Sequence, residues 1–297
     1  MKKILLLVTL ISSIAAAAHA KPLVVATTAD MASITRSIAG DLIELKIIYT
    51  GNVDLHFFEP RPFHVVWVNK ADMLIVAGLD ADEWVYPLLN ASRNPKIQIG
   101  KPGFIDPSAG VKPMNVPDGR IDGSMGHVHE YGNPHYWLDE DNLIIAAENI
   151  ARGLTVLLPD QAGTISERKQ AFIDDTKKTF SALREKMSSV QGMKIIQFHE
   201  SWDYFCRECG MVIAGSIEPK PGVPPTPGHI SDLKGIIATE HVEMVIAEPY
   251  YSNRPIKKLV DGTTIKVVRM PLYLQGEGEL LRHIEKLVDQ ITTEAAK

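Results

Sequence analysis

The sequence predicts an α/β fold with two similar βα lobes, joined by one long rigid connecting helix. Three observations lead to this fold class. Short apolar runs alternate with helical patterns after the first twenty residues, and the same alternation restarts near residue 194. Between the two regions lies a long amphipathic stretch with no strand pattern. Strands that alternate with helices form parallel βα units, so each region is expected to build its own parallel-rich sheet.

The first lobe is expected to cover residues 21–158. Its predicted strands are the apolar runs 22–27, 42–49, 73–77 and 96–99. Its predicted helices, from apolar spacing of three and four, are 31–39, 62–71, 81–89 and 140–158. Residues 101–134 are rich in Gly, Pro, Asp and His and lack any such spacing, which predicts a long functional loop.

The connecting helix is expected between residues 161 and 190, within a linker assigned to 159–192. Its apolar side chains are Ile165, Phe172, Ile173, Phe180, Leu183, Met187 and Val190, with Thr176 among them. The later steps alternate between three and four residues, which is typical of one amphipathic helix. At about 1.5 Å per residue, thirty residues span roughly 45 Å, enough to run along both lobes.

The second lobe is expected to cover residues 193–297. Its predicted strands are 194–198, 212–217, 244–247 and 265–270. One predicted helix begins at Ser201, and three others cover 230–239, 254–261 and 277–292. The order repeats that of the first lobe, so we expect two sheets of similar build.

The N-terminus has the pattern of a secretory signal peptide. Lys2 and Lys3 precede an apolar run that ends in Ala18-His19-Ala20, so residues 1–20 are expected to be removed by cleavage after Ala20. The run is too short to span a bilayer. The residue directly after the expected cleavage point is Lys21 and not a cysteine, so no lipid anchor is evident. This pattern predicts a periplasmic protein.

Composition narrows the range of partners. The formal net charge is −5 and becomes more negative once the two lysines of the signal peptide are removed, which argues against a nucleic acid partner. Hydrophobic residues make up 45% of the chain, which is enough for two apolar cores. We expect the protein to be a monomer.

The two cysteines, Cys206 and Cys209, form a C-x-x-C motif. In an oxidising compartment such a pair could close a small disulfide or remain an inert pair. A redox motif and half of a metal site are the alternatives. No second C-x-x-C is present, which favours the first two interpretations.

Three histidines occupy loops from separate parts of the chain. His56 lies in a loop after the second strand, and His135 is held between the Asn133-Pro134 turn and two aromatic residues. His199 directly follows the strand 194–198. In open α/β sheets ligands bind beyond the carboxyl ends of strands, so these side chains could converge in the cleft between the lobes. Imidazole suits Zn²⁺, whereas Mn²⁺ prefers more carboxylate.

Several segments carry a resemblance to a known family. They are NVDLHFFEPRP at 52–62, KADMLIVAGLDADEW at 70–84, NPHYWLD at 133–139, FHESWDYFCRECG at 198–210 and IAEPYYSNRP at 246–255. In these segments and over nearly its full length, the chain resembles the solute-binding proteins of zinc and manganese ABC importers. The resemblance implies that His56, His135 and His199 are metal ligands. It also implies two α/β lobes joined by one long helix, with the metal between them.

One position departs from that family. Many members supply a fourth ligand, an aspartate, at the end of the last strand, where this chain has Met270. The fourth position could therefore be taken by water, by Glu248 after the strand 244–247, or by another acid. Glu200 and Glu59 are candidates for hydrogen bonds that orient the imidazoles. Keeping three histidines without the carboxylate favours zinc over manganese.

Two further histidines, His127 and His129, lie in the loop 101–134 and could form an accessory metal-collecting loop or be solvated. The remaining histidines of the mature chain have no evident partner and are expected to be solvated. They are His64, His229, His241 and His283.

The function expected from these observations is capture of Zn²⁺ in the periplasm and its delivery to an ABC-type permease in the inner membrane. The protein would then be no enzyme, and zinc would be its transported ligand. The alternatives are a Mn²⁺ or Fe²⁺ binding protein of the same transporter class, a zinc-dependent hydrolase and a binder of a larger chelate. Catalytic zinc is also held by three histidines with an open coordination position, so the ligands alone do not distinguish a hydrolase from a receptor. A hydrolase would in addition need a poised base and a substrate cleft.

Overall fold

The computed structural model describes residues 20–117 and 129–297. Residues 1–19 of the expected signal peptide lie outside the described residues, and so does His127. Within the described part of the chain, no helix combines the length and apolar composition that crossing a membrane requires.

The first lobe is built on a parallel four-stranded sheet with the strand order β2-β1-β3-β4. Its strands are β1 (Leu23–Thr28), β2 (Glu44–Tyr49), β3 (Met73–Ile75) and β4 (Phe104–Ile105). Its helices are α1 (Ala29–Ala39), α2 (Pro62–Lys70), α3 (Val85–Ser92) and α4 (Glu140–Leu157). Strand β1 lies in the middle, where Val24 pairs with Leu45 on one side and Met73 on the other. The predicted parallel sheet is therefore confirmed.

The fourth strand of this sheet is not where the sequence predicted it. Residues 96–99 form turns, and the edge strand is the two-residue β4. The side chain of Asn94 explains the turn: its amide nitrogen donates to the carbonyls of Val68 and Ala71, and its oxygen accepts from the backbone of Lys96. An Asn that bonds to backbone two residues on makes a turn, which the apolar run alone did not reveal.

The second lobe repeats the arrangement with the order β6-β5-β7-β8, again all parallel. Its strands are β5 (Lys194–Gln197), β6 (Val212–Ser216), β7 (Met244–Ala247) and β8 (Lys266–Arg269). Its helices are α6 (Asp203–Cys209), α7 (Pro227–Glu240), α8 (Asn253–Val260) and α9 (Leu280–Ala295). In each lobe the first strand is central, so the chain leaves it once toward each side of the sheet.

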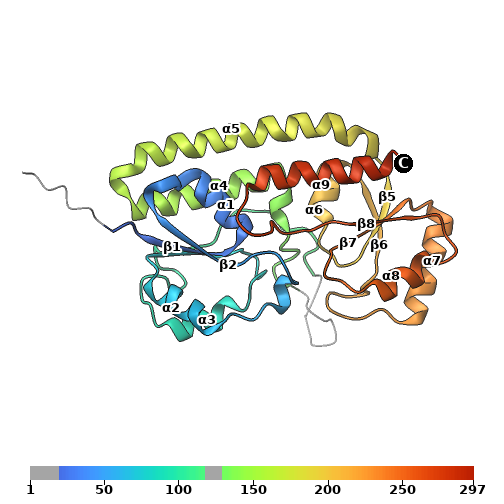
Figure 1. Cartoon of the computed structure of the whole chain (residues 1–297), viewed down its shortest axis with the longest axis horizontal. Coiled ribbons are helices and arrows are strands. Elements are labelled where there is room, and N and C mark those ends of the chain that lie inside the picture. The colour runs from blue at the N-terminus through green and yellow to red at the C-terminus, as the bar shows by residue number, and fades with distance from the viewer. Residues whose placement is uncertain (1–19, 118–128) are drawn as a thin grey trace, which may run out of the picture.

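The long helix α5 (Ala162–Met187) runs along one side of both lobes (Figure 1). Short 3-10 turns extend it at both ends, over Pro159–Gln161 and Ser188–Val190. Its buried side chains are Ile165, Phe172, Ile173, Thr176, Phe180, Leu183 and Met187. These are the positions that the spacing predicted. The helix packs on α1 and α4 of the first lobe and on α9, which extends from the second lobe beside it.

One continuous cluster of buried apolar side chains joins the two lobes. It includes Trp137 from the first lobe, Phe180 from α5 and Trp202 from the second lobe. Each sheet also has a smaller apolar cluster of its own on the other face. Because protein interiors are close-packed, a shared core of this kind holds the two lobes at a fixed spacing. The loops at their facing edges are therefore presented to each other by a rigid frame.

Candidate metal centre

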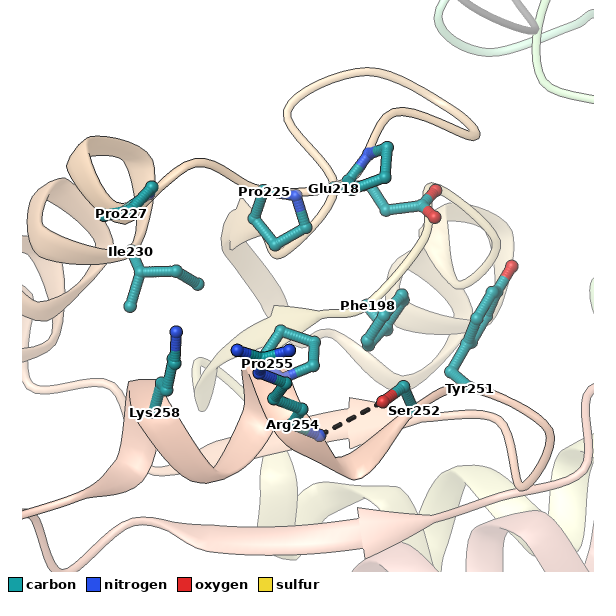
Figure 2. A pocket seen from close by; sticks show the side chains of 11 residues that line it. Phe198, Glu218, Pro225, Pro227, Ile230, Tyr251, Ser252, Arg254, Pro255 and Lys258 are labelled. Atoms are coloured by element: carbon teal, nitrogen blue, oxygen red, sulfur yellow. Dashed lines mark hydrogen bonds between the residues drawn. The ribbon is translucent and has the colours of Figure 1, made fainter.

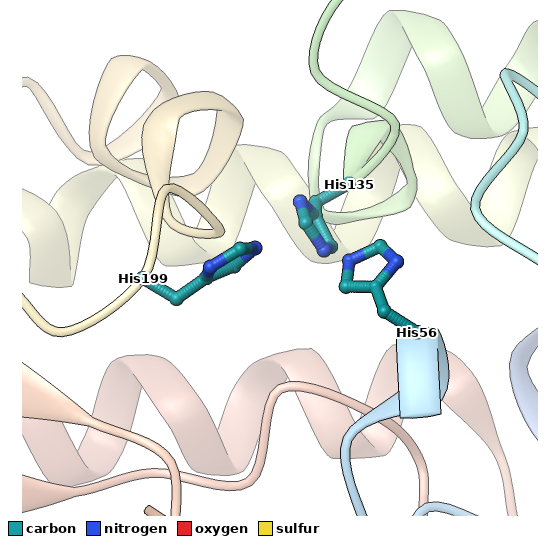
Figure 3. A group of neighbouring side chains, drawn as sticks. All are labelled: His56, His135 and His199. Atoms are coloured by element: carbon teal, nitrogen blue, oxygen red, sulfur yellow. The ribbon is translucent and has the colours of Figure 1, made fainter. Parts of the chain in front are cut away.

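Three histidines converge where the lobes meet (Figure 3). His56 lies on the 3-10 helix η2 (Leu55–Phe57), His135 comes directly before the 3-10 helix η4 (Tyr136–Leu138), and His199 follows β5. One ring nitrogen of each lies within 4.8 Å of the others. The ring centroids are 5.5 Å apart for His56 with either partner and 5.6 Å apart for His135 and His199. His135 and His199 are buried, and His56 is partly buried.

The ring of His135 is oriented by Asn133, two residues before it. The side-chain oxygen of Asn133 accepts from the backbone nitrogen of His135 at 3.0 Å and lies 2.9 Å from its ring Nδ1. A carbonyl oxygen only accepts, so Nδ1 carries the proton and Nε2 keeps its lone pair for a metal. The amide nitrogen of Asn133 donates across the lobe junction to the carbonyl of Glu200 at 2.9 Å and to Asp203 at 3.0 Å.

The ring of His199 is oriented by Glu218, which follows the neighbouring strand β6. Oε2 of Glu218 lies 2.9 Å from Nδ1 of His199 and also accepts from the backbone of Gly222 at 2.9 Å. Nδ1 is again the donor, so Nε2 of His199 faces the other histidines with its lone pair free. A carboxylate behind an imidazole fixes the tautomer and makes the ring a stronger metal ligand.

His56 is positioned through the backbone of its short helix. One oxygen of Asp54 caps this helix by accepting from the backbone nitrogen of His56 at 3.0 Å. The other oxygen accepts from the hydroxyl of Tyr251 in the second lobe at 2.8 Å. Asp54 therefore ties the position of a first-lobe histidine to a loop of the second lobe.

Burial and charge set the protonation of two of these rings. Burial holds the pKa of His135 well below its usual value, and the neighbouring His199 and His129 lower it further. Burial also acts to lower the pKa of His199, but the hydrogen bond and charge of Glu218 outweigh it, so the pKa is raised. His135 is therefore neutral at neutral pH and can bind a cation. Protons compete with a cation for His199 at a higher pH than they do for His135.

The loop histidine His129 stands beside this trio. Its ring centroid lies 4.6 Å from that of His56 and 6.5 Å from that of His135. It also lines a small cavity of about 50 Å³ together with His199 and Glu200. The sequence left His129 either in an accessory metal-collecting loop or solvated, and the structure places its ring at the edge of the histidine cluster.

The acidic candidates are placed differently from one another. Glu248 is completely buried, and one of its oxygens accepts from the hydroxyl of Ser201 at 2.5 Å. Burial raises the pKa of Glu248 to about 7. Its other oxygen has no hydrogen-bond partner within the described residues. Glu200 and Glu59 are both exposed to solvent, and Glu200 also lines the small cavity. The histidines alone form the group of close donor atoms among the described residues.

The segment after the last strand does not present Met270 to the histidines. Met270 is completely buried in the shared apolar cluster, and its backbone nitrogen continues the pairing of β8 by donating to Ala247 at 3.0 Å. The residue of this segment that contacts a site histidine is Tyr273, whose ring centroid lies 6.4 Å from that of His135. An aromatic ring therefore occupies this side of the site, where the family resemblance placed a carboxylate.

The two cysteines are free and buried in this structure, which has no disulfide between them. Both lie on α6, three residues apart. Residues at this spacing on a helix have Cβ atoms about 5–6 Å apart, which exceeds the separation of about 3.5–4.5 Å that a disulfide needs. Burial raises the pKa of both thiols, which disfavours the reactive thiolate.

Three histidines expected to be solvated have backbone partners instead. His229 is half-buried, with its Nε2 2.9 Å from the carbonyl of Ser216, and the other two are buried. His64 is buried, and its Nδ1 accepts from the backbone nitrogen of Arg61 at the start of α2. His283 is buried on α9, with its Nε2 3.3 Å from the carbonyl of Leu272. The expectation of solvation was wrong for all three, because a helical pattern does not show which backbone groups a ring can reach.

Glu218 and Asp54 are the site residues that the sequence analysis missed. Glu218 follows the strand 212–217, so the rule that selected His199 and Glu248 from strand ends would also have selected it. Asp54 stands two residues before His56, a spacing at which an Asp often caps a turn. Their partners in the other strand or lobe could be identified only from the structure.

The fold and the histidine cluster together define a class of protein: a two-lobed α/β protein with three close histidines, able to hold a metal ion, where the lobes meet. The chain belongs to the family described as ZnuA, zinc-uptake complex component A periplasmic, whose sequence model matches residues 24–294.

Curated relatives and solved structures agree with this family. The iron-binding protein YfeA of Yersinia pestis is 24% identical over 81% of this chain and 73% of its own length. The manganese ABC transporter substrate-binding lipoprotein PsaA of Streptococcus mitis is 26% identical over 88% of this chain and 81% of its own length. A crystal structure of ZnuA, 20% identical, superposes with a TM-score of 0.76 over 92% of this chain and 98% of that one. This last likeness confirms the two-lobed fold.

Proposed function

We propose that this protein captures Zn²⁺ through His56, His135 and His199 and delivers it to the permease of an ABC importer. The observation that carries the proposal is the convergence of three ring nitrogens within 4.8 Å of one another, from loops of both lobes. Two of the three rings have their Nδ1 held by Asn133 and Glu218. Rings oriented in this way need little rearrangement to bind an ion, which lowers the entropic cost of binding.

The donor set supports zinc as the cargo. Imidazole suits zinc and other late first-row ions, while manganese and magnesium prefer carboxylate, carbonyl and water. The close donor group contains three imidazoles and no carboxylate among the described residues. Zinc is usually four-coordinate, so one further ligand is needed. Relatives named for iron and manganese make those ions the alternatives. The relative named as an ABC transporter substrate-binding lipoprotein favours a receptor over a hydrolase.

We propose that His129, at the edge of the histidine trio, also contacts the zinc ion. Its ring lies beside that of His56 and at the small cavity that also reaches His199. From this position His129 can bind zinc before the ion reaches the trio, or supply the fourth nitrogen after a small shift of its loop. The first role agrees with the accessory metal-collecting loop that the sequence suggested, whereas the second would make His129 a ligand of the tight site.

A competition titration tests the choice of metal. The mature protein, freed of metal with a chelator and dialysed, is titrated with Zn²⁺, Mn²⁺ and Fe²⁺ against indicators of known affinity. We expect one tight zinc site and much weaker binding of manganese, and we expect zinc in the protein purified from the periplasm. Tighter binding of manganese than of zinc would reject zinc as the cargo.

The proposed cellular role adds export and a membrane partner. We expect residues 1–20 to be removed and the mature protein to be a periplasmic monomer that docks on an inner-membrane ABC permease. The N-terminal sequence of the protein recovered from the periplasm tests the cleavage after Ala20. Retention of the first twenty residues in the cytoplasmic fraction would contradict this location.

A further inference from the structure

The second lobe contains a cavity that the proposed zinc site does not use. It has a volume of about 420 Å³ and lies between the loops that follow β6 and β7 (Figure 2). Small-molecule sites in proteins have volumes of roughly 300–1,000 Å³ and combine apolar walls with a few polar groups. We call this space the α7–α8 cavity, and its lining residues are Phe198, Glu218, Pro224, Pro225, Pro227, Ile230, Tyr251, Ser252, Arg254, Pro255 and Lys258.

The walls of the α7–α8 cavity are flat and apolar. The rings of Phe198 and Tyr251 stack at a centroid distance of 4.1 Å and an interplanar angle of 10°. Pro225 and Ile230 stand opposite these rings in Figure 2, and Pro255 lies at the base. Proline side chains are rigid and offer no backbone donor, so this space favours a flat apolar body over a hydrated ion.

Two cations stand at the outer end of the cavity. Arg254 and Lys258 are four residues apart on α8, so their side chains lie on one face of that helix. Both are exposed, and neither forms an ion pair with any of the described residues. The acid of the lining, Glu218, is at the other end and is already bonded to His199 and Gly222. The cavity therefore has a cationic outer end and an apolar middle.

We propose that the α7–α8 cavity binds a small amphipathic carboxylate with a flat aromatic body, and that its binding strengthens the hold on the metal. The carboxylate pairs with Arg254 and Lys258, while the aromatic body fills the space between the stacked rings and the prolines. Arginine presents a planar fork that matches a carboxylate, and the lysine adds a second positive charge.

Two hydrogen-bonded links connect this cavity to the histidines. Glu218 lines the cavity and holds Nδ1 of His199 at 2.9 Å. Tyr251 lines the cavity and donates at 2.8 Å to Asp54, which in turn accepts from the backbone of His56 at 3.0 Å. A ligand that displaces water from Glu218 and Tyr251 lowers the local dielectric, which strengthens these bonds. The ligand and the metal therefore favour each other's binding, and the coupling is reciprocal.

Isothermal titration of the mature, metal-free protein with benzoate, 2-naphthoate and indole-3-acetate tests binding directly. We expect one 2-naphthoate per chain and much weaker binding of neutral 2-naphthamide. Lys258→Ala and Arg254→Ala should each weaken 2-naphthoate binding about three- to tenfold, the effect of losing one partly exposed charge pair. Lys257→Ala is the matched control, because this exposed lysine is adjacent on α8 and does not line the cavity.

Absence of saturable binding by all three carboxylates would overturn the proposal, and so would an equal loss in Lys257→Ala and Lys258→Ala. If no carboxylate binds but Lys258→Ala slows zinc uptake by cells while Lys257→Ala does not, the cavity is a contact for the permease and the small-molecule proposal fails. Circular dichroism of each variant checks that these surface substitutions leave the fold intact.

The coupling to the metal rests on the proposed zinc site and is measured separately. Zinc titrations with and without saturating 2-naphthoate should show zinc binding about fivefold tighter in its presence, the lower end of the usual range of coupling between two sites. Tyr251→Phe keeps the stacked wall but removes the link to Asp54, so 2-naphthoate should still bind while the coupling weakens. Equal zinc affinities with and without 2-naphthoate would reject the coupling. Failure of zinc to bind at all would reject the proposed function and leave the carboxylate result standing.

Discussion

At the scale of single residues, the site depends on imidazole nitrogens whose direction other side chains set. Asn133 and Glu218 each hold an Nδ1 and leave Nε2 for the ion. Asn133 lies in the turn that carries His135. Glu218 follows β6, the strand that pairs with β5 and therefore lies beside His199. In the proposed site, these bonds direct the imidazole nitrogens toward the ion.

Alanine substitution of each trio histidine tests the ligand set. His56→Ala, His135→Ala and His199→Ala should each weaken zinc binding by at least about a hundredfold, because changing even a supporting partner of a ligand costs about ten- to a hundredfold. Competition titration measures the loss. The control is His241→Asn, an exposed histidine at the end of α7 with a positive φ that Asn tolerates. Near-normal affinity in any one of the three would remove that residue from the site.

Glu218→Gln tests the supporting carboxylate and its effect on pH dependence. The amide can still accept from Nδ1 but brings no negative charge, so zinc affinity at pH 7.5 should fall about tenfold. Because Glu218 raises the pKa of His199, protons compete with zinc there first as the pH falls. In the variant this competition should begin at a lower pH than in the wild type.

Zinc titrations between pH 8 and 5 follow that competition, with the exposed Glu59→Gln as the control. His135, whose pKa burial keeps well below the usual value, should contribute only at the acidic end. An unchanged onset of proton competition in Glu218→Gln would show that this carboxylate does not act on His199.

At the scale of elements, short helices and loops place each ligand, and contacts between lobes fix their relative positions. Tyr204 donates to the carbonyl of Asn133 at 2.9 Å, and Tyr251 donates to Asp54 at 2.8 Å. On the side of α1, Asp30 accepts from the backbone of Leu274 at 3.0 Å. These bonds join the first lobe to three different segments of the second.

His129→Ala tests the loop that borders the cluster. Because His129 lies beside His56, we expect slower zinc capture and a loss of affinity smaller than that of His56→Ala, about tenfold. Stopped-flow association and competition titration give the rate and the affinity. A loss as large as that of His56→Ala would make His129 a full fourth ligand, whereas no change in either quantity would exclude the loop from zinc binding.

Asp30→Asn tests the contact between α1 and the segment before α9. Burial raises the pKa of Asp30 to about 7 in the folded protein, well above its usual value of 3.8. As the pH rises from about 4 to 7, the unfolded chain loses this proton while the folded protein retains it, so stability falls over that range. An amide keeps the acceptor for Leu274 and carries no charge.

We therefore expect Asp30→Asn to stabilise the protein at pH 8, by an amount on the order of a few kcal/mol, and to have little effect at pH 4. Urea unfolding at the two pH values measures this. Asp232→Asn, on the exposed face of α7, should change neither value. Equal stabilisation at both pH values would show that the charge of Asp30 is not the cause.

At the scale of the whole molecule, the shared core and α5 hold the two lobes in a fixed relative position around the proposed metal site. Zinc held by ligands of both lobes should stabilise the protein as a unit. At a free zinc concentration about a hundred times the dissociation constant, the gain is about 2.7 kcal/mol. Calorimetry should show one transition that moves up by several degrees with zinc and returns with a chelator. Two transitions of which zinc shifts only one would indicate that one lobe alone holds the metal.

The sequence by itself predicted the fold class and the long helix. It also indicated which three histidines the structure brings together. Apolar spacing is a local property, so the buried face of α5 and most strands could be predicted from it. The histidines were selected because strand ends and a pinned turn are local features too. The edge strand β4 was missed, because two residues are too few for any periodic signal.

Only the tertiary structure decided what stands around those histidines. Glu218 reaches His199 because β6 pairs with β5, and Tyr251 reaches Asp54 because the shared core sets the spacing of the lobes. Met270 is turned into the core while Tyr273 faces His135. These contacts join residues far apart in the chain, and their geometry depends on packing between elements, which no local pattern encodes.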